Sequence, residues 1–343
     1  MGAPPRLTPR KISCEPVLLS LFSAEADMKK ILVVEYSQTG QLSAVLDALL
    51  APLLEAGADI LVCRETLQPI PAYPYPWPFW QFLDTFPETV VGEPVPLAPL
   101  AVGADCDFDL IILGYPVWFL SPPPALTSFL SSDAGRKLVR GKPVITVTAC
   151  RNMWLMAQEV VKQQLAEAGA RHCDHIALVD QGSAFATFIT TPRWLMTGRK
   201  NSFWGLPAAG VPAAEINDSR RFGLALRDAL GTDAEKQGGP MLHGLRACVV
   251  DTRLIASERV GRRSFCIWAR LLRALGRPGA PLRRALLVFY LVFLITLILT
   301  VVPITMLLKA VLRPLFQKRL TALKIYFEQP SGSDGSRLPL FHE

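Results

Sequence analysis

The sequence lacks a CxxC pair, although seven cysteines occur among its 343 residues. A disulfide framework or a zinc ribbon would need regularly spaced cysteines, so neither is indicated, and a reducing compartment fits better. No internal repeat is visible. Half of the residues are apolar and 19% are charged, which is too apolar a composition for a disordered chain.

A GxGxxG motif is also missing after the first expected strand, which disfavours a dinucleotide-binding domain. From residue 30 onward, apolar runs alternate with helical patterns. We expect strands over 31–36, 59–64, 108–114, 143–149 and 176–180, and helices over 42–56, 124–130, 153–168 and 215–230. This alternation predicts an α/β fold with a doubly wound, five-stranded parallel sheet.

One stretch of the C-terminal third lacks charge altogether. Leu286–Leu308 has no charged residue, and at about 1.5 Å per residue it would span about 34 Å, enough for a hydrocarbon core. Basic residues flank it on both sides, which favours anionic lipid over nucleic acid as the partner. We expect a helix that crosses or re-enters the inner membrane, with the globular domain in the cytoplasm.

The sequence thus divides into six parts. They are a disordered extension (1–27), an α/β domain (28–231) with an insertion at about 182–214, a linker (232–258), a basic amphipathic helix (259–280), the membrane segment (285–308) and a basic, then polar tail (309–343).

A polar loop separates the first expected strand from the first helix. Hydroxyls can donate hydrogen bonds to phosphate oxygens, a glycine lets the backbone approach closely, and a helix N-terminus presents unpaired N–H groups. The alternative is a plain N-capped turn, whose hydroxyls satisfy backbone donors. The phosphate-binding hypothesis covers Ser37, Gln38, Thr39, Gly40, Gln41 and Leu42.

Two further loops follow the third and fourth expected strands. In open α/β sheets, ligands bind at the carboxyl ends of the strands, so these loops and the polar loop meet at one edge. An aromatic side chain there can face a flavin ring, and an arginine can stabilise negative charge. The alternatives are core packing for the aromatic residues and an exposed position for the arginine. The candidates are Pro116, Val117, Trp118 and Phe119 in one loop, and Cys150, Arg151 and Asn152 in the other.

Tryptophans outside these loops are candidates for the wall of a substrate pocket. They are Trp77, Trp80, Trp154 and Trp194, the first two lying in a stiff, Pro-rich segment. The run His172–His175 contains three types of metal ligand, but a single cluster without distant partners indicates solvated polar residues, and we expect no metal site.

The strand–SQTGQL–helix segment resembles the FMN phosphate loop of the flavodoxin-like superfamily, with Leu42 in place of a final threonine. The segment GYPVWF, with the Pro124–Ala125 pair after it, is similar to flavodoxin-like NAD(P)H:quinone reductases. The resemblance implies a flavodoxin-like fold, FMN rather than FAD as cofactor, NAD(P)H as an electron donor, and a homodimer as one arrangement.

The segments KKILVVEYSQTGQL, GYPVWFLSPPPAL, PYPWPFWQF and ITTPRWLMTGRK resemble bacterial dialkylresorcinol condensing enzymes. This resemblance implies an FMN-dependent oxidoreductase that acts on a lipophilic cyclic dione or quinone-like molecule, as in the aromatising step of dialkylresorcinol lipid synthesis. Two alternatives stay open, a flavodoxin-type electron carrier and a flavin-free scaffold tethered to the membrane.

Overall fold

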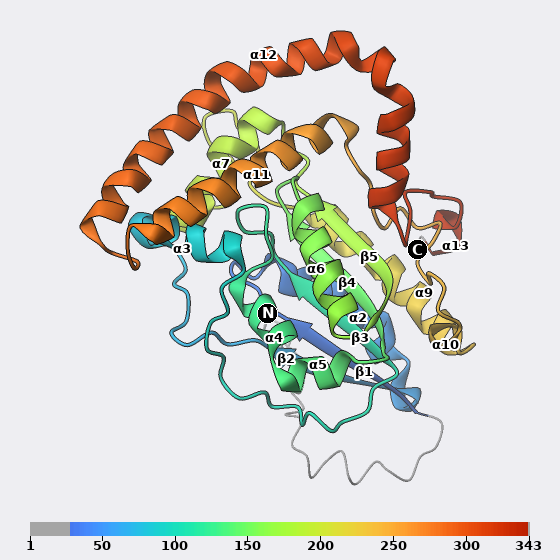
Figure 1. Cartoon of the computed structure of the whole chain (residues 1–343). Helices are drawn as coiled ribbons and strands as arrows, with labels where there is room; N and C mark the ends of the chain where they lie inside the picture. The colour runs from blue at the N-terminus through green and yellow to red at the C-terminus, as the bar shows by residue number, and fades with distance from the viewer. Residues whose placement is uncertain (1–27, 342–343) are drawn as a thin grey trace, which may run out of the picture.

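The computed structural model describes residues 28–341, so the expected extension over 1–27 lies outside the described residues. Five parallel strands form one sheet in the order β2-β1-β3-β4-β5 (Figure 1). This is the flavodoxin-like order of a doubly wound sheet. The strands are β1 (Lys29–Glu35), β2 (Ile60–Thr66), β3 (Leu110–Tyr115), β4 (Pro143–Cys150) and β5 (Arg171–Val179).

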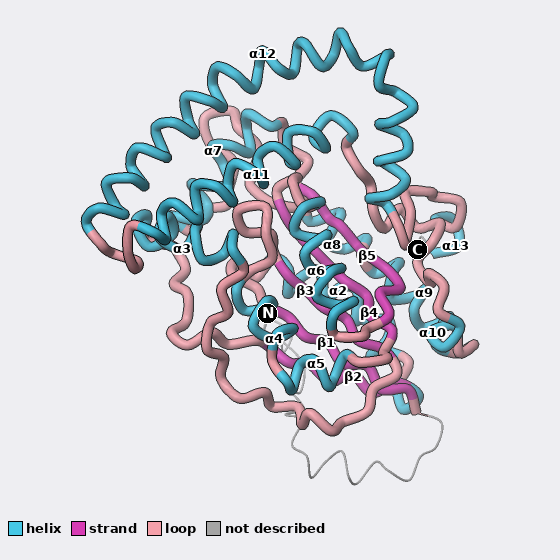
Figure 2. The backbone as a smooth tube through the Cα atoms, viewed as in Figure 1, coloured by secondary structure: helices cyan, strands magenta, loops and turns pink. Residues whose placement is uncertain are grey.

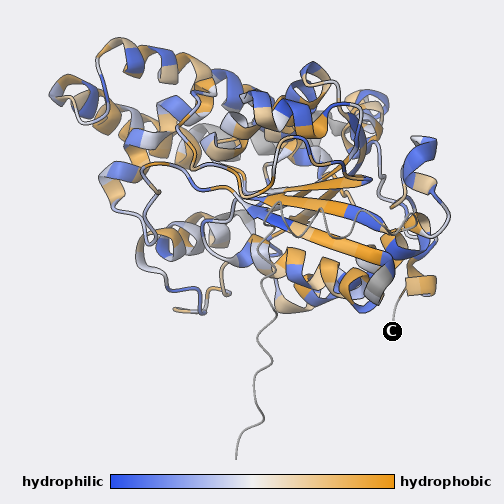
Figure 3. Ribbon diagram, turned by 90° about the horizontal axis from the view of Figure 1, so that it is seen from below, coloured by the Kyte–Doolittle hydropathy of each residue, from blue (hydrophilic) through white to orange (hydrophobic). Residues whose placement is uncertain are grey.

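Helices cover both faces of the sheet, as Figure 2 shows. The three central strands, β1, β3 and β4, are hydrophobic along most of their length, because both of their faces are buried (Figure 3). Ile31 and Val33 of β1 face the cluster that contains α2 (Gln41–Glu55) and α9 (Arg220–Leu230). Leu32 and Val34 face the cluster that contains α4 (Pro124–Ser131), α5 (Asp133–Val139) and α6 (Leu155–Glu167).

The remaining helices lie mostly at the ends and edges of the sheet. The helix expected over 215–230 is divided into α8 and α9, and β5 begins earlier than the sequence suggested. These helices are α3 (Phe79–Val91), α7 (Ala184–Thr197), α8 (Ala213–Asp218), α10 (Ala234–Gln237), α11 (Thr252–Ala274), α12 (Pro281–Glu328), α13 (Leu338–Phe341) and a 3-10 turn, Gly57–Asp59.

The segment expected to be a linker, 232–258, is instead part of the core. Leu242, Leu245 and Ala247 are fully buried, and the Ala177 N–H of β5 donates to the Ala247 carbonyl over 2.9 Å. The linker prediction is therefore wrong over 241–250. Its Gly-rich start looked like a connection, but the residues that follow cover the edge strand of the sheet.

The polar residues of β5 are buried as well, contrary to the solvated cluster expected from the sequence. The Asp174 carboxylate accepts hydrogen bonds from the Met241 N–H (2.7 Å) and the Ser331 hydroxyl (2.7 Å). Burial raises the pKa of Asp174 to about 6 and lowers the pKa of His172 to about 4. Among the described residues, no cluster of three or more His, Cys, Asp or Glu could hold a metal ion.

The long helix α12 arches over α7 and α11 in Figure 1. Among the described helices it is the one that is long and apolar enough, over Pro281–Thr300, to cross a membrane. The C-terminal end of α12 returns to the domain, where Phe327 is 2% exposed, and Ser331, just beyond the helix, is fully buried. Within the tail expected over 309–343, residues 327–341 therefore dock on the domain.

Candidate functional site

A cavity of about 150 Å³ lies at the carboxyl edge of the sheet, where the loops after β1, β3 and β4 meet. Parallel topology alone brings these loops together, because their strands are neighbours in the sheet. Gly40 and Asn152 belong to the loops without lining the cavity. The predicted cofactor residues that do line it are Ser37, Gln38, Thr39, Gln41, Leu42, Pro116, Val117, Trp118, Phe119, Cys150 and Arg151.

The loop after β1 leads directly into α2. Gly40 adopts the left-handed conformation (φ 79°) at the N-cap and has no side chain to cap the helix, and the Gln41 N–H makes only a long, 3.5 Å bond to the Thr39 hydroxyl. The Ser37 hydroxyl oxygen is buried, and no described atom hydrogen-bonds to it. A buried hydroxyl without a partner costs about 1–3 kcal/mol, so this loop offers an unused hydrogen-bonding group next to unpaired backbone N–H groups.

The two glutamines of this loop support neighbouring segments with their side chains. The Gln38 amide donates to the Pro74 carbonyl over 2.7 Å, and the Gln41 amide oxygen accepts from the Val211 N–H over 2.8 Å. Leu42 is 2% exposed and packs in the hydrophobic core. A leucine therefore stands at the final position of the motif because the side chain there faces the core.

Aromatic rings form one wall of the cavity. The ring of Trp118 lies edge-on to three others, with centroid distances of 5.6 Å to Tyr36, 5.1 Å to Tyr73 and 5.4 Å to Trp77. Edge-to-face packing of this kind fixes ring orientation and stabilises each pair by about 0.5–1.5 kcal/mol. The wall is therefore prearranged, and Trp118 both packs against it and lines the cavity.

A tight turn holds this wall in place. Trp118 and Ser121 exchange two backbone hydrogen bonds of 2.9 Å, and the residues between them, Phe119 and Leu120, have φ of 49° and 59°. Two adjacent non-glycine residues in this region store backbone strain. The Arg262 guanidinium of α11 donates to the Ser121 hydroxyl over 2.6 Å, so α11 supports the strained turn.

The loop after β4 brings a cation to the cavity. Arg151 donates from Nε to the Thr187 hydroxyl over 2.8 Å, and burial lowers its pKa. Burial also raises the pKa of the Cys150 thiol far above its ordinary value, so this cysteine is held protonated. A protonated thiol is a poor nucleophile, which agrees with a binding rather than a nucleophilic position for Cys150.

The four tryptophans predicted to form a substrate pocket separate into two pairs. Trp77 and Trp194 line the cavity. Trp80 is 42% exposed and lies under the Arg284 guanidinium (5.3 Å). Trp154 is 2% exposed and packs against the His175 ring (4.9 Å), outside the cavity. The prediction that Trp80 and Trp154 line the pocket is therefore wrong. The starts of α3 and α6 turn these two side chains away from the cavity.

Sequence reasoning missed several residues of the site. Asp180 lines the cavity at the end of β5, and its carboxylate accepts from the N–H groups of Gly182 (2.8 Å) and Gly210 (2.7 Å). Its position at the end of the strand expected over 176–180 could have identified it. Nothing in the local sequence marks the others, which come from α3, α7 and the loop after α7: Phe82, Thr191, Leu195 and Gly210.

The carboxylate of Glu258, on α11, caps the start of α6 beside the β4 loop. It is fully buried and accepts a hydrogen bond from the Met156 N–H over 2.7 Å. No side chain of the α6 N-cap itself accepts a hydrogen bond. Burial raises the pKa of Glu258 to about 7. The cavity loop after β4 is thus connected to α11 through one titratable group.

We expect Glu258→Gln to change the pH dependence of stability. An unfolded glutamate titrates near 4.5, so between about pH 4.5 and pH 7 the folded chain keeps a proton that the unfolded chain loses. The wild-type free energy of unfolding should therefore fall by about 3 kcal/mol relative to the variant as the pH rises through this range.

Urea unfolding at several pH values measures this difference, because contributions from Asp174 and His172 cancel between the two proteins. The control is Glu167→Gln at the exposed C-terminal end of α6, the helix whose start Glu258 caps. Parallel pH profiles for wild type and Glu258→Gln would contradict the prediction.

No protein-family model matches the chain, and no curated protein matches it. Among solved structures it is similar to a flavoprotein from Lactobacillus acidophilus in complex with FMN (15% identity, 44% of this chain and 92% of that one, TM-score 0.32). It is also similar to general stress protein 14 from Treponema denticola in complex with FMN (12%, 59% and 99%, TM-score 0.30) and to a flavodoxin from the domain Archaea (11%, 59% and 99%, TM-score 0.32).

Proposed function

We propose that the chain is a membrane-associated, FMN-dependent oxidoreductase that acts on a lipophilic cyclic dione or quinone-like substrate. The observation that carries the proposal is the cavity where the three loops meet, with the unpartnered Ser37 hydroxyl in the loop before α2. A flavodoxin-like strand order supports a ligand at this edge of the sheet.

The loop before α2 fits a terminal phosphate. Ser37 and Thr39 supply hydroxyl donors, and the first turn of α2 supplies backbone N–H groups and the positive end of its dipole. A terminal phosphate is present in FMN, whereas FAD carries a pyrophosphate within the molecule, so we propose FMN as the cofactor. Gly40 keeps a side chain out of this space.

Trp118, Phe119 and the backbone of their loop would hold the flavin ring. When bound, FMN exchanges two electrons and the accompanying hydrogen with a substrate. Arg151 stabilises negative charge at the cavity, since an arginine stays protonated even when burial lowers its pKa. The cavity is smaller than the roughly 300–1,000 Å³ of ordinary ligand pockets, so side chains of α7 must give way when the ring enters.

The proposed substrate class rests on the aromatic residues that line the cavity outside the three loops. Trp77, Phe82 and Trp194 surround the cavity with aromatic surface, which excludes water and accepts an apolar ring. Oxidation of a cyclohexanedione to a resorcinol removes two hydrogens from the substrate, and a bound flavin would supply the acceptor for them. In the opposite direction, NAD(P)H would supply the electrons for reduction of a quinone-like molecule.

The full chain, purified in detergent, tests the proposal. We expect a yellow protein that releases FMN at about one per chain, and a flavin that bleaches without oxygen when an alkylated cyclohexanedione or NAD(P)H is added. A folded, colourless protein that does not bind added FMN would overturn the proposal. Stable formation of a blue semiquinone, with no bleaching by any dione or nicotinamide, would favour an electron carrier instead.

Trp118→Ala should raise the dissociation constant for FMN about tenfold, because it removes one ring of the wall and loosens the other three. Titration of the apoprotein with FMN, followed by quenching of flavin fluorescence, measures the effect. Trp204→Ala is the matched control, since Trp204 is 94% exposed and lies outside the cavity. Equal affinities for the two variants would mean that Trp118 only packs the core.

A further inference from the structure

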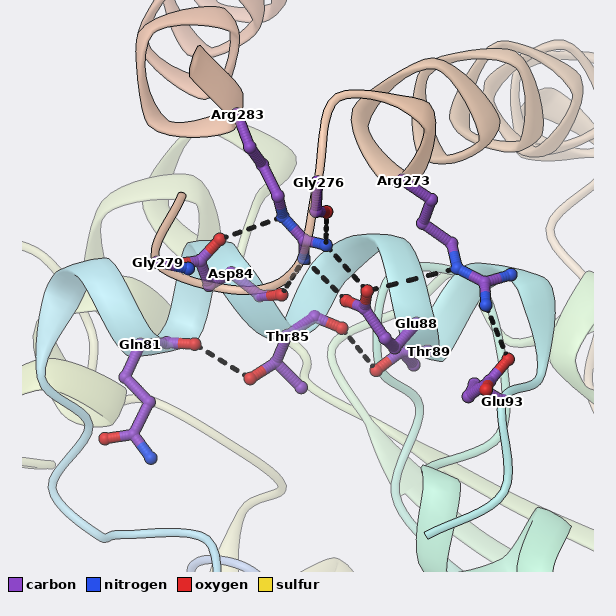
Figure 4. Close-up of polar contacts among 10 residues, drawn as sticks. All are labelled: Gln81, Asp84, Thr85, Glu88, Thr89, Glu93, Arg273, Gly276, Gly279 and Arg283. Carbon is purple, nitrogen blue, oxygen red and sulfur yellow. Dashed lines mark hydrogen bonds and ion pairs between the residues drawn. The ribbon is translucent and has the colours of Figure 1, made fainter. Parts of the chain in front are cut away.

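Both ends of the apolar helix α12 dock on the same globular domain. At its start, Arg283 is fully buried and its guanidinium bonds to the carboxylates of Asp84 (3.1 Å) and Glu88 (2.7 Å for each of two bonds), both on α3 (Figure 4). The Gly279 N–H, just before α12, also donates to Asp84 over 3.0 Å. This end of the helix is therefore fixed to α3 by buried ion pairs.

The other end of α12 docks about 45 residues later, beside β5. Phe327 is 2% exposed and lies under the Arg259 guanidinium of α11 (5.3 Å). The Glu328 carboxylate accepts from the Val250 N–H over 3.2 Å, and the Ser331 hydroxyl bonds to Asp174. The helix leaves the domain at α3 and returns to it at β5, as the arch in Figure 1 shows.

One side of the first half of α12 is apolar and open to solvent, while the opposite side packs on the domain. Leu287 and Tyr290 are 1% and 5% exposed. The outward residues recur at helical spacing and are large and apolar: Leu282 (61%), Phe289 (59%), Val292 (59%) and Leu299 (62%). A stripe of this kind marks an interaction surface rather than an ordinary exposed face.

Exposed basic residues lie near both ends of α12, and those near its C-terminal end lie beyond the apolar stripe. Arg277 and Arg284 flank its start, and Lys318 and Arg319 lie near the end of α12. Basic residues on both flanks suit anionic headgroups on a single side of a bilayer. The partner that matches this surface is therefore an anionic membrane, whose acyl chains would contact the apolar stripe and whose headgroups would contact the basic residues.

We propose that α12 lies within one leaflet of an anionic membrane, as an arch whose two ends stay on the same side as the domain. A helix that crossed the bilayer would separate its ends by a hydrocarbon core of about 30 Å. The docking sites of both ends belong to one domain, which cannot occupy both sides. The arch therefore dips into the membrane and returns.

This arrangement brings the membrane close to the candidate site. The ring of Tyr290 in α12 stacks on Phe86 (5.0 Å), and Phe86 contacts Phe119 (5.3 Å), which lines the cavity. Two aromatic rings, those of Phe86 and Phe119, thus lie between Tyr290 of the arch and the cavity. An apolar substrate could reach the cavity from the leaflet, and this part of the inference rests on the proposed function. The position of the arch in the membrane does not depend on that function.

The topology is tested on the full chain with an epitope at each terminus, expressed in a bacterium. We expect the chain in the membrane fraction, with both epitopes digested by protease in inside-out vesicles and both protected in intact spheroplasts. Opposite patterns for the two epitopes would show a crossing helix and overturn the proposal. A chain found only in the soluble fraction would overturn it as well.

A second experiment uses substitutions on the arch. Leu282→Asp with Leu299→Asp should weaken binding to vesicles that contain phosphatidylglycerol by at least about tenfold, because charge is costly in the hydrocarbon region. Leu54→Asp is the matched control, since Leu54 on α2 is 59% exposed and far from the arch in sequence. Flotation of detergent-free protein with vesicles measures binding, and bound flavin, measured separately, reports on the proposed function.

Unchanged flotation of the double variant, or an equal loss for Leu54→Asp, would overturn the proposal. Vesicles of phosphatidylcholine alone give the second comparison. We expect weaker binding to them than to phosphatidylglycerol vesicles, and equal binding would contradict the role of the basic flanks.

Discussion

Gly40→Val is expected to raise the dissociation constant for FMN by at least about a hundredfold, or about 2.7 kcal/mol. Gly40 has φ 79°, where a β-branched residue is strained by about 1–3 kcal/mol. A Cβ at Gly40 would meet no other atom within 4 Å, so the side chain would project into open space at the start of α2. That space is where we propose that the phosphate binds.

The backbone strain of a valine at positive φ could by itself destabilise the protein. The control substitution must therefore be made at another glycine with positive φ. Gly57 has φ 73° and likewise no atom within 4 Å of an added Cβ, but it follows the far end of α2. We expect Gly57→Val to lower stability as much as Gly40→Val while FMN binding stays as in wild type. FMN titration and urea unfolding separate the two effects. Retention of FMN by Gly40→Val would refute the assignment of the phosphate loop.

Arg283→Met should lower the free energy of unfolding by about 3–5 kcal/mol. The substitution leaves the carboxylates of Asp84 and Glu88 without their cation, and the side chains of these two residues are only 12% and 20% exposed. Methionine matches the length of the arginine stem but supplies no hydrogen bond. We expect the start of α12 to separate from α3 in this variant.

The neighbouring Arg273→Met provides the control. Arg273 is 39% exposed and pairs with Glu93, which is 48% exposed, so its loss should cost less than about 1 kcal/mol. Urea unfolding of the full chains in detergent, followed by tryptophan fluorescence, measures both variants. Similar losses for the two would mean that the buried position of Arg283 carries no special stability.

The sequence predicted the sheet and the convergence of the loops for a physical reason. Apolar runs such as 31–34 and 110–113, separated by helical patterns, are typical of strands buried on both faces, and parallel connections place the following loops at one edge. The polar loop before α2, the Trp118 loop and the Arg151 loop could therefore be placed without any knowledge of tertiary contacts. Their role in binding FMN stays a prediction.

The errors share one cause, which is that they depend on partners far away in the chain. Asp174 looks like a solvated residue until Met241 and Ser331 are seen to satisfy its carboxylate. Trp154 follows the right strand, but the turn into α6 directs its ring toward His175. No local pattern encodes such contacts.

The bond between Ser331 and Asp174 joins residues 157 positions apart, with the whole of α12 between them. During synthesis, β5 leaves the ribosome long before the residues that satisfy its buried carboxylate, and the apolar helix emerges in the interval. The β5 edge of the nascent domain therefore lacks these contacts while α12, its most aggregation-prone segment, is already exposed. Early insertion of α12 into a nearby leaflet would protect that segment from aggregation. It would also keep the residues after α12 close to β5, where Ser331 bonds to Asp174.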